Sequence, residues 1–165
     1  MAEDRSERVV QYDLAGPRVG VTFSPDGKEA ISQFGWHFEN QVSPGRHGPW
    51  LIVEKVFLVG GLERNAFIPN GSLIFGLRTP SSFEIGVGPS VTLGGMNGFN
   101  SGLVAAAGHS FRMGGIRIPM NVAAAWQKGG DVQWTLITGW AIRGMVLQPA
   151  QHGDWPSHQL ERGGS

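Results

Sequence analysis

Residues 83–93, FEIGVGPSVTL, alternate strictly between two kinds of side chain. The odd-numbered positions are all apolar, and the even-numbered positions carry Glu, Gly, Gly, Ser and Thr. Because successive side chains of a β-strand point to opposite faces, this pattern predicts a strand with one apolar face and one polar or small face. The fold of the chain depends on what the apolar face meets.

The same alternation recurs between turn signals along most of the chain. These signals, rich in Gly, Pro, Asn and Asp, lie at 24–29, 40–48, 60–65, 79–82, 94–102, 113–115 and 128–131. Between them lie about eight segments of strand length, which is typical of an antiparallel meander. A meander leaves two exposed edges unless its first and last strands pair, and closure into a barrel removes both. We therefore expect an all-β fold, a single antiparallel up-and-down β-barrel of about eight strands with short turns.

The length and the distribution of the strands predict one folded unit with two extensions. The chain has 165 residues, which suits one domain. We expect an N-terminal arm at 1–16, the β-barrel at 17–143 and a polar C-terminal tail at 144–165. In 50–59, WLIVEKVFLV, either parity could be the apolar face, and Glu54 and Lys55 stand in its middle.

The composition excludes several kinds of chemistry. The chain has no cysteine, which excludes disulfides, thiol catalysis and cysteine-bound metals. Its formal net charge is zero, so no basic field favours nucleic acid as a partner. The chain contains no run of 18 apolar residues, which is the length that would predict a membrane-spanning helix. Charged residues make up only 16% of the chain, which is little for a protein surrounded by water.

The apolar faces are predicted to point outward. An eight-stranded barrel is just wide enough inside for ordinary side chains, so it cannot hold all the large apolar residues of these strands. With the faces reversed, small and polar residues fill the lumen and the large apolar residues meet hydrocarbon, as in outer-membrane barrels. The expected outer apolar wall includes Phe34, Trp36, Phe38, Phe75, Trp126, Trp134 and Trp140.

Several segments carry a resemblance to a known kind of protein. They are ISQFGWHFE, LVGGLE, LIFGLRTPSSFEIGVGPSVTL, IRIPMNVAAAW and WTLITGWAIR, and the resemblance covers roughly residues 17–143. The chain resembles bacterial outer-membrane-type β-barrel proteins of uncharacterised function and, more loosely, the small eight-stranded barrels of the OmpA and OmpX kind. The resemblance implies a barrel in the bacterial outer membrane with the lipid bilayer as its partner.

Charged residues gather at one predicted rim of the lumen. Seven of them occupy lumen-facing positions at the rim that holds both termini: Arg18, Glu39, Arg78, Glu84, Arg112, Arg117 and Arg143. Buried charges need partners, so we expect ion pairs that fill the lumen there. An anion or headgroup site is the alternative, because the forked donors of arginine suit such ligands.

The turn at 79–82, TPSS, allows a specific pairing to be predicted. Arg78 and Glu84 flank this turn on neighbouring antiparallel strands, and both have lumen-facing parity. Cross-strand charges in this arrangement should contact each other, with Arg112 or Arg117 as a second partner.

No arrangement of residues predicts catalysis. His109 and Ser110 are adjacent in one strand and therefore point to opposite faces, so they cannot act as a pair. His37 lies two residues from Glu39 on the lumen face, where a structural hydrogen bond is the favoured interpretation over an acid–base pair. The remaining histidines lack metal-ligand spacing. We expect no enzymatic activity, no metal and no cofactor.

Two functional hypotheses remain from the sequence. The first is a non-enzymatic bacterial outer-membrane-type barrel with a structural or small-solute and anion-binding role. The alternative is an extracellular self-assembling subunit of a filament or lattice, in which the apolar wall and the terminal extensions contact copies of the same chain.

Overall fold

The computed structural model describes residues 10–24, 26–43, 49–94, 98–128 and 130–143. It consists of strands and one short 3₁₀ helix, η1 (Leu62–Arg64). The strands are β1 (Val10–Phe23), β2 (Ala30–Ser43), β3 (Trp50–Gly60), β4 (Ile68–Arg78), β5 (Phe83–Leu93), β6 (Phe99–Met113), β7 (Ile116–Gln127), β8 (Val132–Gly139) and β9 (Ala141–Arg143). Within these ranges, no helix has the length and apolar character needed to cross a membrane.

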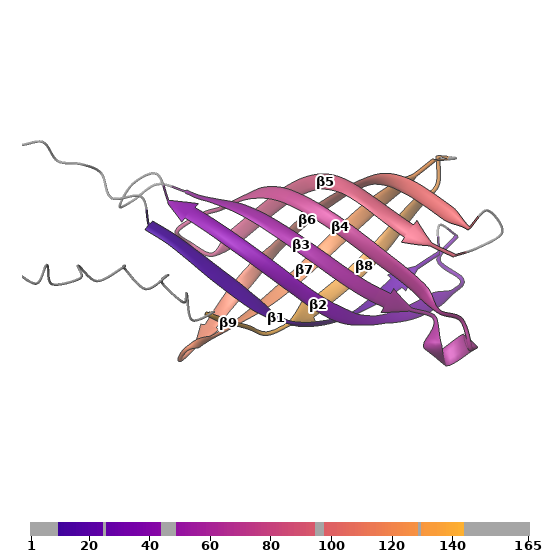
Figure 1. The fold of residues 1–165 in the computed structure, drawn as a ribbon, viewed down its shortest axis with the longest axis horizontal. Coiled ribbons are helices and arrows are strands. Elements are labelled where there is room, and N and C mark those ends of the chain that lie inside the picture. The colour runs from indigo at the N-terminus through magenta and orange to yellow at the C-terminus, as the bar shows by residue number, and fades with distance from the viewer. Residues whose placement is uncertain (1–9, 25, 44–48, 95–97, 129, 144–165) are drawn as a thin grey trace, which may run out of the picture.

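The strands close into a barrel (Figure 1). Each strand from β1 to β7 pairs antiparallel with the next, and β1 also pairs with β8 and β9. β9 continues β8 after an interruption at Trp140, whose backbone N–H donates to the carbonyl oxygen of Pro17 at 3.3 Å. The ring therefore has eight strand positions, and the predicted closed up-and-down barrel is confirmed.

The two ends of the barrel differ in what they carry. The terminal end holds the start of β1, the end of β9 and the turn at 79–82 (Figure 1, left). The distal end holds η1 and the turns that join β1 to β2 and β7 to β8 (Figure 1, right). Short connections at the distal end leave the lumen uncovered by any long described loop.

Side chains alternate between the lumen and the outside along every strand. The seven residues predicted for the outer wall are each 46–53% exposed and lie on the outside of the barrel. Each strand position adds large exposed apolar side chains, for example Val19, Trp36, Phe57, Phe75, Ile85, Leu103, Met120 and Trp134. We call this surface the apolar wall.

The register of β3 resolves the ambiguous segment at 50–59. Ile52, Glu54 and Val56 are buried inside the barrel, whereas Lys55 is exposed on its outside. Lys55 lies opposite Phe38 of β2 and Leu73 of β4, at the middle of its strand. A single charge therefore interrupts the apolar wall on this side.

The first strand begins earlier than predicted. β1 starts at Val10, so residues 10–16 of the expected N-terminal arm belong to the barrel. Leu14 is buried and lies opposite Glu39, and Leu14 continues the inward alternation of Arg18. The polar residues next to it concealed this pattern, because Asp13 points outward and accepts a hydrogen bond from the Asn40 side chain at 2.7 Å. The other residues of the arm and the tail at 144–165 lie outside the described residues.

Lumen-facing glycines allow the strands to curve closely against each other. At Gly35 an added methyl group would meet the backbone carbonyl of Phe57, and at Gly88 it would meet that of Leu73. Glycine in a strand interior often marks close backbone approach or tight barrel curvature. The contacts at these two positions agree with that interpretation.

Candidate functional site: a plugged, cup-shaped lumen

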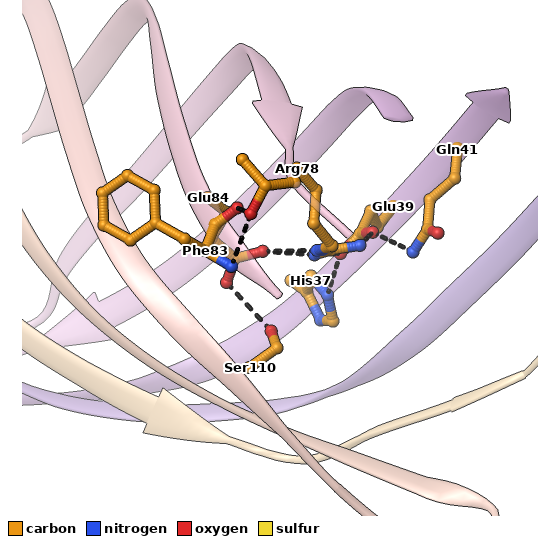
Figure 2. A network of polar contacts seen from close by, with 8 residues as sticks. His37, Glu39, Gln41, Arg78, Phe83, Glu84 and Ser110 are labelled. Carbon is orange, nitrogen blue, oxygen red and sulfur yellow. Dashed lines mark hydrogen bonds and ion pairs between the residues drawn. The ribbon is translucent and has the colours of Figure 1, made fainter. Parts of the chain in front are cut away.

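Three buried charges meet at the terminal end of the lumen (Figure 2). Arg78 at the end of β4 lies between Glu84 at the start of β5 and Glu39 of β2. Arg78 Nε donates to Glu84 Oε2 at 2.8 Å and Nη2 donates to Glu39 Oε2 at 2.9 Å. Nη1 also pairs with Glu39 Oε1, and Nη2 with Glu84 Oε2. All three side chains are at most 3% exposed, and we call them the charge plug.

Neighbouring polar groups complete the hydrogen bonding of the charge plug. Ser110 of β6 donates its hydroxyl to Glu84 Oε1 at 3.0 Å, and the Gln41 side-chain amide donates to Glu39 Oε1 (Figure 2). His37 Nε2 lies 3.7 Å from Glu39 Oε2, and its Nδ1 lies 3.2 Å from the carbonyl oxygen of Gly16. Buried charges are tolerated when they are paired and hydrogen-bonded in this way.

The arginines of the predicted rim cluster do not all join the charge plug. Arg78 contacts Glu84 as expected, but its second carboxylate partner is Glu39. Arg112 and Arg117 lie opposite each other on β6 and β7, and neither forms an ion pair with a described residue. The expectation that one of them shares the Arg78–Glu84 pair is wrong.

The other two arginines lie elsewhere or outside the described side chains. Arg18 faces the lumen but lies on the far side of the charge plug, where it lines a cavity. Arg143 ends β9 with its backbone opposite Leu14, and its side chain is not among those described. Parity placed Arg18 and Arg78 on the lumen face, where the structure has them, but the level along the barrel axis depends on the strand tilt and register.

A cavity of about 770 Å³ occupies the rest of the lumen. Its distal part is lined by polar side chains, among them Gln33, Asn70, Thr92, Asn100, Gln127 and Gln133. Its middle is apolar, with Val56, Leu58, Ile74, Val104 and Ile137. Arg18, Glu54 and Asn121 also line it, whereas no residue of the charge plug does. The lumen is therefore a cup that opens at the distal end and is closed towards the terminal end.

Arg18 and Glu54 differ from the charge plug in having no close partner. Arg18 is 4% exposed, and no hydrogen bond or ion pair joins it to a described residue. Its Nη1 is fully buried without a hydrogen-bond partner. Glu54 is 7% exposed and likewise forms no ion pair within the described chain. The sequence pattern missed Glu54 because the parity of 50–59 was ambiguous.

Asn121 links the cup to the charge plug. With its side-chain amide oriented to satisfy both polar atoms, its nitrogen donates to Glu84 Oε1 at 3.1 Å and to the carbonyl oxygen of Met120 at 2.9 Å. One side chain therefore contacts the charge plug and lines the cavity above it.

The described residues offer no cluster for a metal ion, and His109 and Ser110 do not meet. Among them, no group of three or more His, Asp or Glu side chains is arranged to hold a metal ion. His109 lies on the outside, where its Nε2 is 2.9 Å from the carbonyl oxygen of Ser81, while Ser110 is buried in the lumen. These two residues point to opposite faces of β6, as their adjacent positions require.

Comparison with known proteins identifies relatives in fold only. No protein-family model and no curated protein sequence matches this chain. The barrel is similar to Ail, the attachment invasion locus protein of Yersinia pestis, with a TM-score of 0.52 and 13% identity over 81% of this chain and 97% of that one. Neisserial surface protein A gives a TM-score of 0.44 and 15% identity over 84% of this chain and 100% of that one. The designed barrel TMB2.3 gives a TM-score of 0.46 and 18% identity over 88% of this chain and 99% of that one. The likeness to Ail is one of fold, a small closed β-barrel.

Proposed function

We propose that this chain is a non-enzymatic β-barrel of the bacterial outer membrane, which spans the bilayer with its apolar wall and has a lumen closed to through-flow. Its role is structural or solute-binding rather than that of a pore. The apolar wall is the observation that carries the proposal. Large apolar side chains cover the outside of all the strand positions, while buried polar and charged side chains such as Arg18, Glu39 and Arg78 lie in the lumen.

The apolar wall has the properties expected of a surface in hydrocarbon. Exposed apolar patches of monomeric soluble proteins rarely exceed a few hundred Å². Strands that cross a bilayer need about 9–11 residues when tilted. β3, β4 and β5 have 11 residues each, and polar turns follow at both ends.

The charge plug supports the absence of a pore. Eight strands enclose a lumen that side chains can fill. Arg78, Glu39 and Glu84 cross the lumen from three strands and are almost completely buried. Small solutes can enter the cup from the distal end, but the ion-paired side chains block their exit at the terminal end.

Tryptophan quenching tests the bilayer assignment. The barrel is reconstituted in vesicles of brominated phosphatidylcholine and, separately, of the unbrominated lipid, and the fluorescence is compared. Trp36 lies on the apolar wall, whereas Trp50 packs against Tyr12 with ring centroids 5.4 Å apart. Trp36→Phe should remove a quenched component, and the matched control Trp50→Phe should leave the quenched component unchanged.

Two outcomes would contradict the proposal. A chain that remains monomeric in buffer without detergent or lipid, and keeps its β-sheet circular dichroism, has no need of a membrane. Ordered assemblies that form without lipid and do not insert into vesicles would favour the self-assembling subunit, with neighbouring copies against the apolar wall. Deleting 144–165 separates the two hypotheses further, because only assembly through the tail depends on those residues.

A further inference from the structure

The cup contains two ionisable side chains that have no close partner. Arg18 of β1 and Glu54 of β3 both line the cavity and are both more than nine-tenths buried. Both side chains face the same cavity, yet they do not come within ion-pair distance of each other. A buried charge without a partner is costly, so a ligand that supplies the missing partner gains binding energy there.

The separation of these charges follows from the strand order. β2 lies between β1 and β3, and its Gly35 is paired with Arg18 on one side and Leu58 on the other. Glu54 is instead paired with Glu39, four residues further along β2, so Arg18 and Glu54 are offset from each other along the barrel wall. With Glu54 ionised, an anion alone would meet the attraction of Arg18 and the repulsion of Glu54, and a cation alone would meet the reverse. A molecule with both charges satisfies both groups.

The wall beside the charged pair is apolar. Val56, Ile74, Val104 and Ile137 line the middle of the cavity. The volume of about 770 Å³ lies within the range usual for small-molecule sites, roughly 300–1,000 Å³. Such sites combine an apolar lining with a few placed polar groups. The cup therefore fits a ligand with a charged head and an apolar group.

We propose that the cup binds a small zwitterion with an apolar group, similar to an α-amino acid, with its carboxylate on Arg18 and its ammonium group on Glu54. The apolar group lies against Val56 and Ile74. This inference adds a ligand class to the proposed barrel, and it does not depend on whether the apolar wall meets lipid or protein.

Three probes that share the leucine side chain test the proposal on the full chain in a nonionic detergent. Leucine carries both charges, 4-methylpentanoate lacks the ammonium group, and 3-methylbutylamine lacks the carboxylate. Binding is measured by isothermal titration calorimetry and by the NMR shift of the arginine Nε–H signals. Leucine should bind about tenfold more tightly than either single-charge probe, because each loses charge-assisted hydrogen bonds.

Two variants assign the charges to their residues. Arg18→Gln should weaken the binding of leucine about tenfold, so that leucine binds no more tightly than 3-methylbutylamine. Glu54→Gln should instead lower the affinity for leucine to that for 4-methylpentanoate. Arg112→Gln is the matched control, because Arg112 is exposed and does not line the cavity. This substitution should leave the affinity for all three probes unchanged.

Other results would overturn the inference. Equal binding of leucine and 4-methylpentanoate to the unmodified barrel would identify a simple anion site. Equal binding of all three probes, or binding of none, would show that the two charges do not select a ligand. Because the probe series uses the unmodified barrel, the test remains decisive even where a variant fails to fold. A loss of membrane insertion with intact probe selectivity would refute the proposed function and leave this inference standing.

Discussion

Replacing Arg78 by alanine should destabilise the barrel strongly. Arg78 is 2% exposed and holds two carboxylates, Glu39 and Glu84, that are 2% and 3% exposed. Without the guanidinium, both carboxylates stay in the lumen with neutral hydrogen-bond donors such as Gln41 and Ser110 but without their cation. Removing one partner of a buried ion pair costs about 3–5 kcal/mol, because the remaining charge is uncompensated.

The free energy of unfolding is measured by urea titration of the barrel in lipid vesicles, with tryptophan fluorescence as the signal. Arg78→Ala should lower it by about 3 kcal/mol or more. Lys28→Ala is the control, because Lys28 lies in an exposed turn 3.8 Å from Asp26. Exposed pairs of this kind contribute only about 0–1 kcal/mol, so the control should change the free energy little.

A charge-free plug distinguishes lost charge pairing from lost packing. Combining Glu39→Gln, Arg78→Met and Glu84→Gln keeps the volume of the lumen and removes all three charges. This triple variant should regain most of the stability lost in Arg78→Ala, since a buried ion pair can be replaced by groups of similar volume at small cost. Equal stability of Arg78→Ala and Lys28→Ala would refute the reasoning, because it would mean that water enters the lumen and solvates the carboxylates.

Two further substitutions test the wall and the curvature of the barrel. Lys55→Met should raise the free energy of unfolding in a bilayer by about 2 kcal/mol, because a lysine at the midplane of a barrel costs about 2–4 kcal/mol. The control Lys128→Met, in an exposed turn, should not raise it. No gain from Lys55→Met would mean that Lys55 does not lie at mid-bilayer. Gly88→Ala should destabilise the same unfolding equilibrium by more than about 1 kcal/mol, because the new methyl group meets the Leu73 carbonyl, whereas Gly115→Ala has open space. Equal effects of the two glycine substitutions would show that the strands shift apart without cost.

Local sequence pattern was sufficient to predict the barrel and the direction of most side chains. Alternation within a strand sets which residues share a face, and the turn at 79–82 sets the register of its two flanking strands. The Arg78–Glu84 contact follows from these two local facts, and the structure contains it. Glu39 as the second partner was beyond this reasoning, because it comes from β2, which is separated from β4 by β3.

The features that depend on closure were not predictable from local pattern. Arg18 and Arg78 share the lumen face, but the tilt of the strands places Arg18 in the cup and Arg78 in the charge plug. The sequence did not decide which of Glu54 and Lys55 faces the lumen, because this depends on how β3 pairs with both of its neighbours. The interruption at Trp140 also has no local signal, since its role is visible only in the hydrogen bond to Pro17.

The pairing of β1 with β8 and β9 joins the two ends of the described chain in one ladder. Leu14 lies opposite Arg143, and Ala15 lies opposite Ile142. The closed ring of strands therefore does not depend on which strand comes first along the polypeptide. A linker from Arg143 to Val10, with new termini in the turn at 24–29, would keep every strand pairing and give a circular permutant of the same barrel.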